Sequence, residues 1–259
     1  MVEGAHDARR FKKFFDDTSC SIINCFGKDN VTGTIENEQN SANDDVIGFV
    51  DVDFDRITGT HADNDDIIHS VHHDFDLDVC LSDAIERYFI EVCDERKVVD
   101  FGGCRPCVTN ILESLKPLSA LRYANQRHRL GYSLKELKHD EFYDGATVDI
   151  DALINHVSDA RFDTVGHRQA LRGYISQYTS SDLNLLQLTN GHDFCAALGI
   201  SLRSRIGRRN NPQTWGSEVE KHLRLAFDIN DFRETGILRL IQNWEQRNGH
   251  RILKGSTMQ

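Results

Sequence analysis

Apolar positions in the first hundred residues change repeatedly between two spacings, which predicts strands separated by helices. Short apolar runs bounded by polar residues indicate strands, whereas apolar residues three or four positions apart indicate helices. Such an order is typical of an α/β fold, a parallel sheet with helices on both faces. We expect strands at 20–26, 46–51 and 67–72, and helices at 5–15, from about residue 30, and at 77–92.

Helical spacing takes over after residue 104. Apolar stripes run from Ile150 to Val157 and from Ile237 to Trp244, and each predicts a helix with one buried face. The acidic stretch from Asp140 to Asp149 is expected to connect two helices. We therefore predict an α/β domain at 1–104 and a mainly helical region at 105–259, which is either a separate domain or an elaboration packed on the sheet.

The strand expected at 46–51 leads into alternating aspartates, Asp51, Asp53 and Asp55. Side chains two positions apart on a strand share a face, so these carboxylates are expected to converge. Converging carboxylates repel one another unless a cation lies among them, and hard divalent cations prefer oxygen ligands. We expect Mg²⁺, with Mn²⁺ as an alternative, at the carboxyl edge of the sheet. The simpler interpretation is an acidic surface loop.

Neighbouring residues separate this pattern from two known aspartate motifs. An EF-hand loop beginning at Asp51 requires Gly at its sixth position and Glu at its twelfth, where this chain has Arg56 and Ala62. A haloacid-dehalogenase-type phosphatase has Thr or Val at the position of Asp55. The sequence therefore disfavours the calcium loop and leaves the phosphatase as an alternative.

An acidic motif at the start of the chain favours a different interpretation of these aspartates. Val2-Glu3-Gly4-Ala5-His6-Asp7, followed by the strand that ends Asp51-x-Asp53, resembles the TOPRIM domain of topoisomerases, primases and OLD-family nucleases. The resemblance extends to a TOPRIM-like family encoded beside ABC-type ATPases in bacterial antiphage operons, which includes the TOPRIM effector of the PARIS defence system. The segments that carry this wider resemblance are Gly27-Lys28-Asp29-Asn30-Val31, Asp76-Leu77-Asp78, Gly191-His192-Asp193 and Ile241-Gln242-Asn243-Trp244-Glu245.

This resemblance implies a Mg²⁺-dependent endonuclease that cleaves RNA, such as tRNA, or DNA. Such a protein would be the toxic effector of an antiviral defence system, held in check by an ABC-type ATPase. Glu3, Asp51 and Asp53 would be catalytic, and Asp7 and Asp78 would join them as metal ligands. The alternative is a non-catalytic TOPRIM-like subunit that binds a partner, because Met1 and Val2 alone are too few for a buried strand and Glu3 is expected to be poorly held.

Charge is distributed unevenly along the chain. The formal net charge of −11 argues against a protein that coats nucleic acid non-specifically. A nuclease nevertheless needs basic residues for the phosphate backbone. The candidates are Lys28, Arg203, Arg205, Arg208 and Arg209. The alternative is that the arginines solvate helix faces or pair with carboxylates.

Several other polar residues have simpler interpretations. His72 and His73, near Asp74, are expected to be hydrogen-bonded polar residues rather than phosphate donors. Asp193 is expected to cap a helix, with Gly191 giving the turn its freedom. The seven scattered cysteines, including the Cys104-x-x-Cys107 pair, fit reduced thiols better than a disulfide framework or a zinc site.

The sequence also predicts where the protein is located and whether it binds ATP itself. No apolar run reaches the length of a membrane span and no segment has the form of a signal peptide, so we expect a cytoplasmic protein with no membrane partner. No Gly-x-x-x-x-Gly-Lys-Ser/Thr motif is present, so ATP-driven control would have to come from another polypeptide. Homodimerisation and the choice between RNA and DNA stay open.

Overall fold

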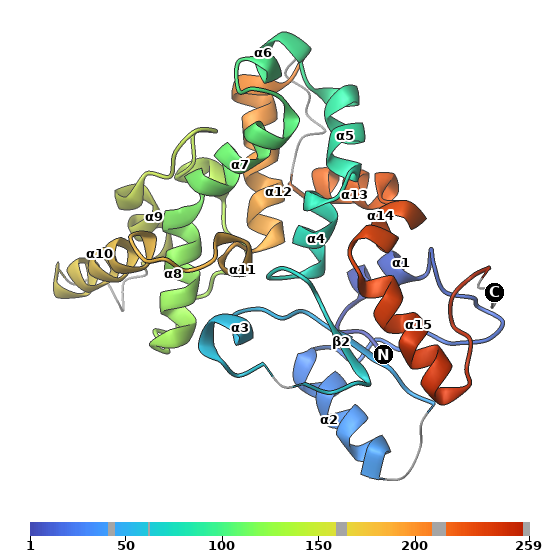
Figure 1. The fold of residues 1–259 in the computed structure, drawn as a ribbon. Coiled ribbons are helices and arrows are strands. Elements are labelled where there is room, and N and C mark those ends of the chain that lie inside the picture. The colour runs from blue at the N-terminus through green and yellow to red at the C-terminus, as the bar shows by residue number, and fades with distance from the viewer. Residues whose placement is uncertain (41–44, 62, 159–164, 209–215, 256–259) are drawn as a thin grey trace.

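A short parallel sheet lies where the sequence predicts one. The structure, a computed structural model, describes residues 1–40, 45–61, 63–158, 165–208 and 216–255. Strand β1 (Gly48–Val50) pairs in parallel with β2 (Ile67–His69), with Gly48 opposite Ile67 and Val50 opposite His69. Both strands are shorter than the segments predicted at 46–51 and 67–72, and Figure 1 shows them at the centre of the lower half of the molecule.

The first residues of the chain extend this sheet. Val2 forms parallel bridges with Asn24 on one side and Phe49 on the other. The Val2 N–H donates to the Ile23 carbonyl, and the Phe49 N–H donates to the Met1 carbonyl, each at 2.9 Å. The order across the sheet is therefore residue 24, residue 2, β1 and β2. Within 20–26 only Asn24 pairs in this way, so the predicted strand is not formed along its length.

Helices cover both faces of the sheet, as predicted. Gly48 and Val50 face α2 (Lys28–Asn40), and a Cβ on Gly48 would lie only 2.8 Å from Val31 Cγ1. Phe49 points to the other face, where its ring centroid is 4.5 Å from that of Phe11 in α1 (Ala5–Phe11). This division follows from the alternation of side chains along a strand.

The segment predicted as one helix at 77–92 is two helices, α4 (Phe75–Leu81) and α5 (Ala84–Val92). Ser82 between them has an extended backbone, with φ of −73° and ψ of 178°. Its hydroxyl donates to the Val79 carbonyl at 2.7 Å and accepts the N–H of Ala84 at 3.2 Å. These local hydrogen bonds compete with those of a continuous helix and divide it.

The chain beyond residue 104 is mainly helical, as expected. The stripes predicted at Ile150 and Ile237 form α9 and α15, and 140–149 connects helices. The remaining elements are α3 (Asp55–Thr58), α6 (Glu95–Val99), α7 (Cys104–Ser114), α8 (Lys116–Arg127), η1 (His139–Glu141), α9 (Ile150–Val157), α10 (Val165–Thr179), α11 (Leu185–Leu188), α12 (Gly191–Ser201), the π-helical η2 (Leu202–Ile206), α13 (Gly216–Ala226), α14 (Ile229–Glu234) and α15 (Ile237–Asn248).

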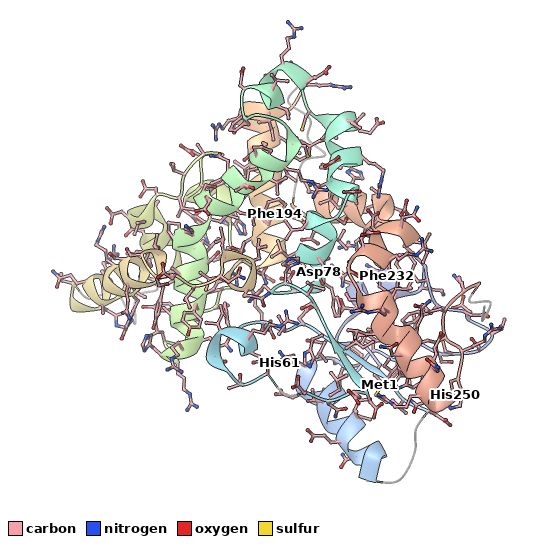
Figure 2. All side chains as sticks on the ribbon, in the orientation of Figure 1. Met1, His61, Asp78, Phe194, Phe232 and His250 are labelled. Atoms are coloured by element: carbon pink, nitrogen blue, oxygen red, sulfur yellow. The ribbon has the colours of Figure 1, made fainter. Side chains whose placement is uncertain are left out.

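One hydrophobic core runs across the predicted boundary at residue 104. Helix α12 packs against α4, α7 and α13, and α15 packs against β2. Phe194 and Phe232, both fully buried, belong to the same cluster as Phe49. Figure 2 shows Phe194 and Phe232 on either side of Asp78. The helical region is thus packed onto the α/β part. In the part of the chain that the structure describes, no helix is both long and apolar enough to cross a bilayer.

Candidate functional site

Glu3 follows the interior segment of the sheet, and its side chain reaches the end of β1. Its Oε1 accepts the backbone N–H of Asp51 at 2.7 Å. Its backbone carbonyl accepts the N–H of Gly27 at 3.0 Å. Glu3 is therefore held on both sides, and the expectation that the short N-terminal segment would hold it poorly is wrong. Pairing of residue 2 with β1 supplies the support that a longer strand was expected to give.

Asp51 points from the end of β1 towards the start of α4, where its Oδ1 accepts the N–H of Phe75 at 2.8 Å. Asp74 lies next to it and caps α4, accepting the N–H of Leu77 at 2.7 Å. The second oxygen of Asp74 accepts the N–H of Gly191 at 2.7 Å, which joins α4 to α12. Sequence reasoning missed Asp74 as a site residue, although an Asp immediately before a helical segment is the usual sign of an N-cap.

Burial and mutual repulsion raise the pKa values of three carboxyl groups, Glu3, Asp51 and Asp74, which we call the acidic cluster. Burial raises the pKa of Glu3 to about 7, and Asp53 and Asp7 add to the shift. Burial also raises the pKa of Asp51 well above its usual range, with Asp74, Asp7 and Glu3 adding to the shift. Burial raises the pKa of Asp74 to about 6. The protein therefore compensates negative charge incompletely at this edge of the sheet.

Asp53 pairs with a lysine beside the acidic cluster. Lys28 Nζ lies 3.1 Å from Asp53 Oδ2 and 2.7 Å from Asp55 Oδ2. Although burial opposes its charge, Asp53 and Asp55 raise the pKa of Lys28. The backbone of Asp53 has φ of 52°, in the left-handed region, and α3 begins two residues later. The strand thus ends at Val50, and the strand alternation that predicted a shared face does not extend to Asp53 and Asp55.

Asp7 contributes charge to the site but shares it with a buried arginine. Its Oδ1 lies 2.5 Å from Arg10 Nη1, and its Oδ2 accepts the N–H of Gly4 at 3.1 Å. Arg10 is 4% exposed and pairs with Asp76 as well, so it joins α1 to α4. The Arg10 guanidinium therefore neutralises one side of the site, and Asp7 raises the pKa of Glu3 from its position next to this pair.

His192 adds a positive charge at the start of α12. Its Nδ1 lies 2.7 Å from Glu220 Oε1 and its Nε2 lies 3.8 Å from Asp76 Oδ2. The hydrogen bond with Glu220 raises the pKa of His192 to about 9, and Asp76 adds to the shift. This half-exposed imidazole is therefore an imidazolium at neutral pH, which the sequence pattern did not indicate.

Asp78, predicted to ligate a metal, holds the turn after β2 instead. Its Oδ2 accepts the N–H of Val71, and its Oδ1 accepts the N–H of His72 and lies 2.8 Å from His72 Nδ1. Both oxygens are thus engaged, because the turn would otherwise leave its N–H groups without partners. His73 Nδ1 lies 3.0 Å from the Gln187 carbonyl. Both histidines are hydrogen-bonded, as expected.

Two of the four predicted phosphate-binding arginines contact backbone carbonyls. Arg205 donates to the Gly145 carbonyl at 3.0 Å, and Arg208 donates to the Cys93 and Ile90 carbonyls at the end of α5. Both follow the end of α12 that is opposite to Gly191, roughly 20 Å along the helix axis from the acidic cluster. The structure therefore does not bring Arg205 or Arg208 to the acidic cluster.

The other two predicted phosphate-binding arginines are Arg203 and Arg209. Arg203 lines a cavity that it shares with His6 and His192, whereas Arg209 lies outside the described residues. Lys28, also among the predicted basic residues, contacts the predicted catalytic carboxylate Asp53.

The motif at 191–193 has a different role from the predicted one. Asn190, not Asp193, caps α12 by accepting the N–H of His192 at 3.0 Å. Asp193 is buried and pairs with Arg122, whose Nη2 lies 2.7 Å from Asp193 Oδ1. This ion pair, together with His139, holds the pKa of Asp193 well below its usual range despite burial.

Gly191 is required for close packing rather than for turn freedom. A Cβ at this position would lie 2.4 Å from Asp74 Oδ1 and 2.6 Å from the Leu77 nitrogen. Only glycine lets α12 approach α4 this closely. The predicted roles of Gly191 and Asp193 were therefore both wrong, because they depend on contacts with segments distant in sequence.

The cysteines form no disulfide, and all seven lie in the described part of the chain. Burial raises the pKa of Cys104 to about 12 and that of Cys107 to about 11. Zinc binds thiolates, which these environments disfavour.

The predicted metal ligands Glu3, Asp51 and Asp53 already have partners within the protein. Among the residues that the structure describes, no three His, Cys, Asp or Glu side chains are placed to hold one ion. Glu3 and Asp51 each accept a backbone N–H, and Asp53 is paired with Lys28. The donor chemistry nevertheless suits a hard cation, because all three side chains offer carboxylate oxygens.

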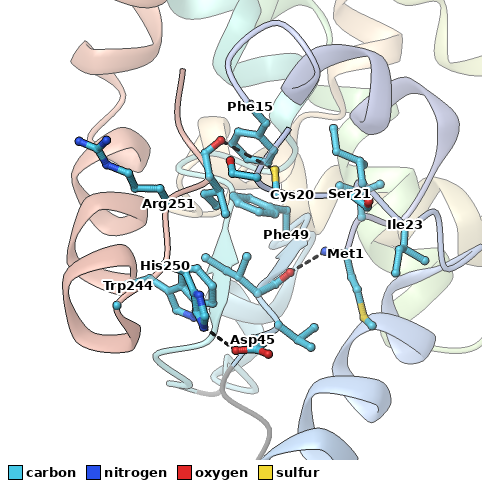
Figure 3. A pocket seen from close by; sticks show the side chains of 17 residues that line it. Met1, Phe15, Cys20, Ser21, Ile23, Asp45, Phe49, Trp244, His250 and Arg251 are labelled. Atoms are coloured by element: carbon cyan, nitrogen blue, oxygen red, sulfur yellow. Dashed lines mark hydrogen bonds and ion pairs between the residues drawn. The ribbon is translucent and has the colours of Figure 1, made fainter. Parts of the chain in front are cut away.

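A separate cavity of about 530 Å³ opens at the opposite, amino edge of the sheet. Figure 3 shows Met1, Cys20, Phe49 and Trp244 around it. The Met1 amine donates to the Ile47 carbonyl at 2.6 Å. The predicted catalytic carboxylates do not line this cavity, and ligands of parallel sheets bind at the carboxyl edge. The acidic edge is therefore the candidate functional site.

Comparison with known proteins adds no relative. The chain matches no protein-family model, no curated protein and no solved structure.

Proposed function

We propose that the chain is a metal-dependent endonuclease of the TOPRIM type, cleaving phosphodiester bonds in RNA, such as tRNA, or in DNA. The observation that carries this proposal is the contact between the Glu3 carboxylate and the Asp51 backbone at the carboxyl edge of parallel strands. A glutamate after one strand and an Asp-x-Asp after its neighbour is the arrangement that the TOPRIM resemblance implies.

Glu3, Asp51 and Asp53 would hold Mg²⁺ or Mn²⁺, with Asp7 as an outer ligand. Such an ion, when bound, would neutralise charge on the phosphodiester and lower the pKa of a bound water. If Asp51 and Asp53 alone held the ion, Glu3, whose pKa burial raises to about 7, would instead exchange a proton near neutral pH as a general acid or base. Asp53 would exchange its contact with Lys28 for the ion, which leaves Lys28 to contact a phosphate oxygen as a point charge.

The regulatory part of the proposal follows from the family resemblance and from charge. We propose that the chain is the toxic effector of an antiphage system and that an ABC-type ATPase holds it in check. A formal net charge of −11 gives poor long-range attraction for nucleic acid. Release from a partner, or a high local concentration near its basic surface, would then control when cleavage begins.

A cleavage assay tests this proposal. The purified protein is incubated with tRNA, plasmid DNA and single-stranded DNA, with Mg²⁺, with Mn²⁺ or with EDTA. We expect cleavage of at least one substrate that requires the divalent ion and is lost in Glu3→Gln, which keeps an oxygen to accept the Asp51 N–H. Absence of ion-dependent cleavage of all substrates, by the isolated chain and by the chain with its ATPase, would refute the proposal.

A non-catalytic, partner-binding subunit is the second candidate. The ion pair between Lys28 and Asp53 favours it, because a lysine that neutralises a carboxylate is a stable alternative to a metal ion. The same assay separates the two candidates, since this subunit would bind the ATPase without cleaving any substrate in the presence of Mg²⁺.

A further inference from the structure

Phe26 is an exposed aromatic residue beside the proposed catalytic site. Its side chain is 84% exposed, the largest exposed fraction among the described large hydrophobic residues. It lines a cavity of about 520 Å³ together with Lys28, Asp53 and Gln126. Single exposed apolar side chains are common on protein surfaces, so exposure alone would mean little.

The backbone supplies a second, independent observation. Phe26 has φ of 58°, in the left-handed region, where a bulky non-glycine residue is strained. Neighbouring contacts hold it there. The Phe26 N–H donates to Asn24 Oδ1 at 3.0 Å, the Gly27 N–H donates to the Glu3 carbonyl at 3.0 Å, and Asn30 donates to the Cys25 carbonyl at 2.7 Å.

Because the ring is exposed, side-chain packing does not offset this backbone strain. Glycine would adopt the same backbone without strain. A phenylalanine held rigidly, exposed and next to Lys28 is therefore best explained by a ligand that covers its face. Unpaired nucleobases stack on aromatic side chains, and this recognition requires a base outside a duplex. Gln126, on the same cavity, has an amide that can hydrogen-bond to a base edge.

We propose that Phe26 is the stacking platform for an unpaired base of a single-stranded or looped nucleic acid, next to the phosphodiester that Lys28 would contact. This inference rests on the proposed nuclease function and deepens it, because it defines the substrate as unpaired at the cleavage site. RNA and DNA share this chemistry, so the experiment carries an arm for each. Phe26 is a positioning residue, since it holds the base and not the reacting atoms.

The test measures binding of short RNA and DNA oligonucleotides that carry 2-aminopurine, a base whose fluorescence falls when it stacks. Single strands and their duplexes are titrated in EDTA and in Mg²⁺, and cleavage is followed by electrophoresis in the same samples. The proteins are the parent, Phe26→Ala, Phe26→Gly, Phe26→Trp and a control, Leu225→Ala, whose side chain is 70% exposed on α13. Thermal unfolding of each variant establishes that it is folded.

We expect the parent to quench the single-stranded probe, and Phe26→Ala and Phe26→Gly to weaken single-strand binding about ten-fold or more. Phe26→Trp and Leu225→Ala should bind like the parent, and Phe26→Gly should unfold at no lower temperature. Single-strand affinity that is unchanged in Phe26→Ala, or absent in the parent, would overturn the inference. A Phe26→Gly variant that binds the probe normally but loses an ATPase partner would also overturn it. Phe26-dependent binding without cleavage, by the isolated chain and by the chain with its ATPase, would uphold this inference while refuting the nuclease.

Discussion

Glu3 is the residue at which burial has the clearest consequence for stability. Its folded-state pKa of about 7 lies above its unfolded value of about 4.5, so the folded protein binds more protons between these values. Glu3 therefore contributes stability that is full below about pH 4.5 and is lost as the pH rises through 7. Without metal ions, Glu3→Gln should be more stable than the parent at pH 8, by on the order of 2 kcal/mol, and equally stable near pH 4.5.

Chemical denaturation at a series of pH values measures this difference. Because the Gln side chain keeps an acceptor for the Asp51 N–H, the comparison isolates the charge. Asp17→Asn, at an exposed aspartate far from the acidic edge, serves as the matched control. A parent protein that is as stable as Glu3→Gln at pH 8 would show that the Glu3 carboxyl is not perturbed in this way.

Divalent ions should offset the destabilisation that the ionised Glu3 carboxylate causes at high pH. At pH 8 a bound cation compensates the acidic cluster, so Mg²⁺ or Mn²⁺ should raise the unfolding temperature of the parent. At an ion concentration about 100 times the dissociation constant, the gain in unfolding free energy is about 2.7 kcal/mol. Asp51→Asn should abolish the gain. Differential scanning calorimetry with Mg²⁺ and with an equal ionic strength of NaCl separates binding from screening, and equal shifts in both salts would argue against a specific site.

At the residue scale, sequence reasoning predicted part of the site. It grouped Glu3 with Asp51 and Asp53 through the TOPRIM resemblance, and the Glu3 carboxylate does contact the Asp51 backbone. It did not predict the left-handed Asp53, which no periodicity encodes, or its pairing with Lys28. Asp74 and Arg10 were missed because their importance comes from contacts between α1, α4 and α12, whose sequence separation hides them.

At the element scale, the turn after β2 depends on Asp78. This buried carboxylate accepts the backbone N–H groups of Val71 and His72. Asp78→Ala should lower the unfolding free energy by about 3 kcal/mol, because two partly buried N–H groups would lose their partner. Thermal and urea unfolding measure the loss. A direct metal ligand would behave differently, since its removal would relieve repulsion. If Asp78→Ala is as stable as the parent and no longer responds to Mg²⁺, Asp78 is a metal ligand after all.

The elements themselves were predictable to different degrees. Amphipathic stripes such as the one from Ile237 to Trp244 gave correct helices, since a single buried face is encoded locally. The strands were shorter than their apolar runs, because pairing partners and not hydropathy set where a strand ends. The division of 77–92 at Ser82 depends on a hydroxyl that hydrogen-bonds to its own helix, which apolar periodicity does not report.

At the scale of the whole molecule, the net negative charge is the property that favours control by a partner protein. We expect the chain to co-purify with the ABC-type ATPase that the proposed function assigns to it, and to be less toxic in cells when that ATPase is co-expressed. Affinity purification from cells that express both proteins, with growth followed in parallel, tests this expectation. Full activity and tight regulation in the isolated chain, with no partner recovered, would establish a stand-alone enzyme instead.

The most direct test of the central claim is the Mg²⁺-dependent cleavage rate of Asp53→Asn compared with Asp55→Asn. Both aspartates pair with Lys28, and both replacements remove one charge at nearly the same place. Asparagine tolerates the left-handed backbone of residue 53 better than alanine. The account predicts that Asp53→Asn cleaves about 100-fold more slowly or worse, because a metal ligand supplies several kcal/mol at the transition state, whereas Asp55→Asn cleaves within a few-fold of the parent. Equal rates for Asp53→Asn and the parent would contradict it.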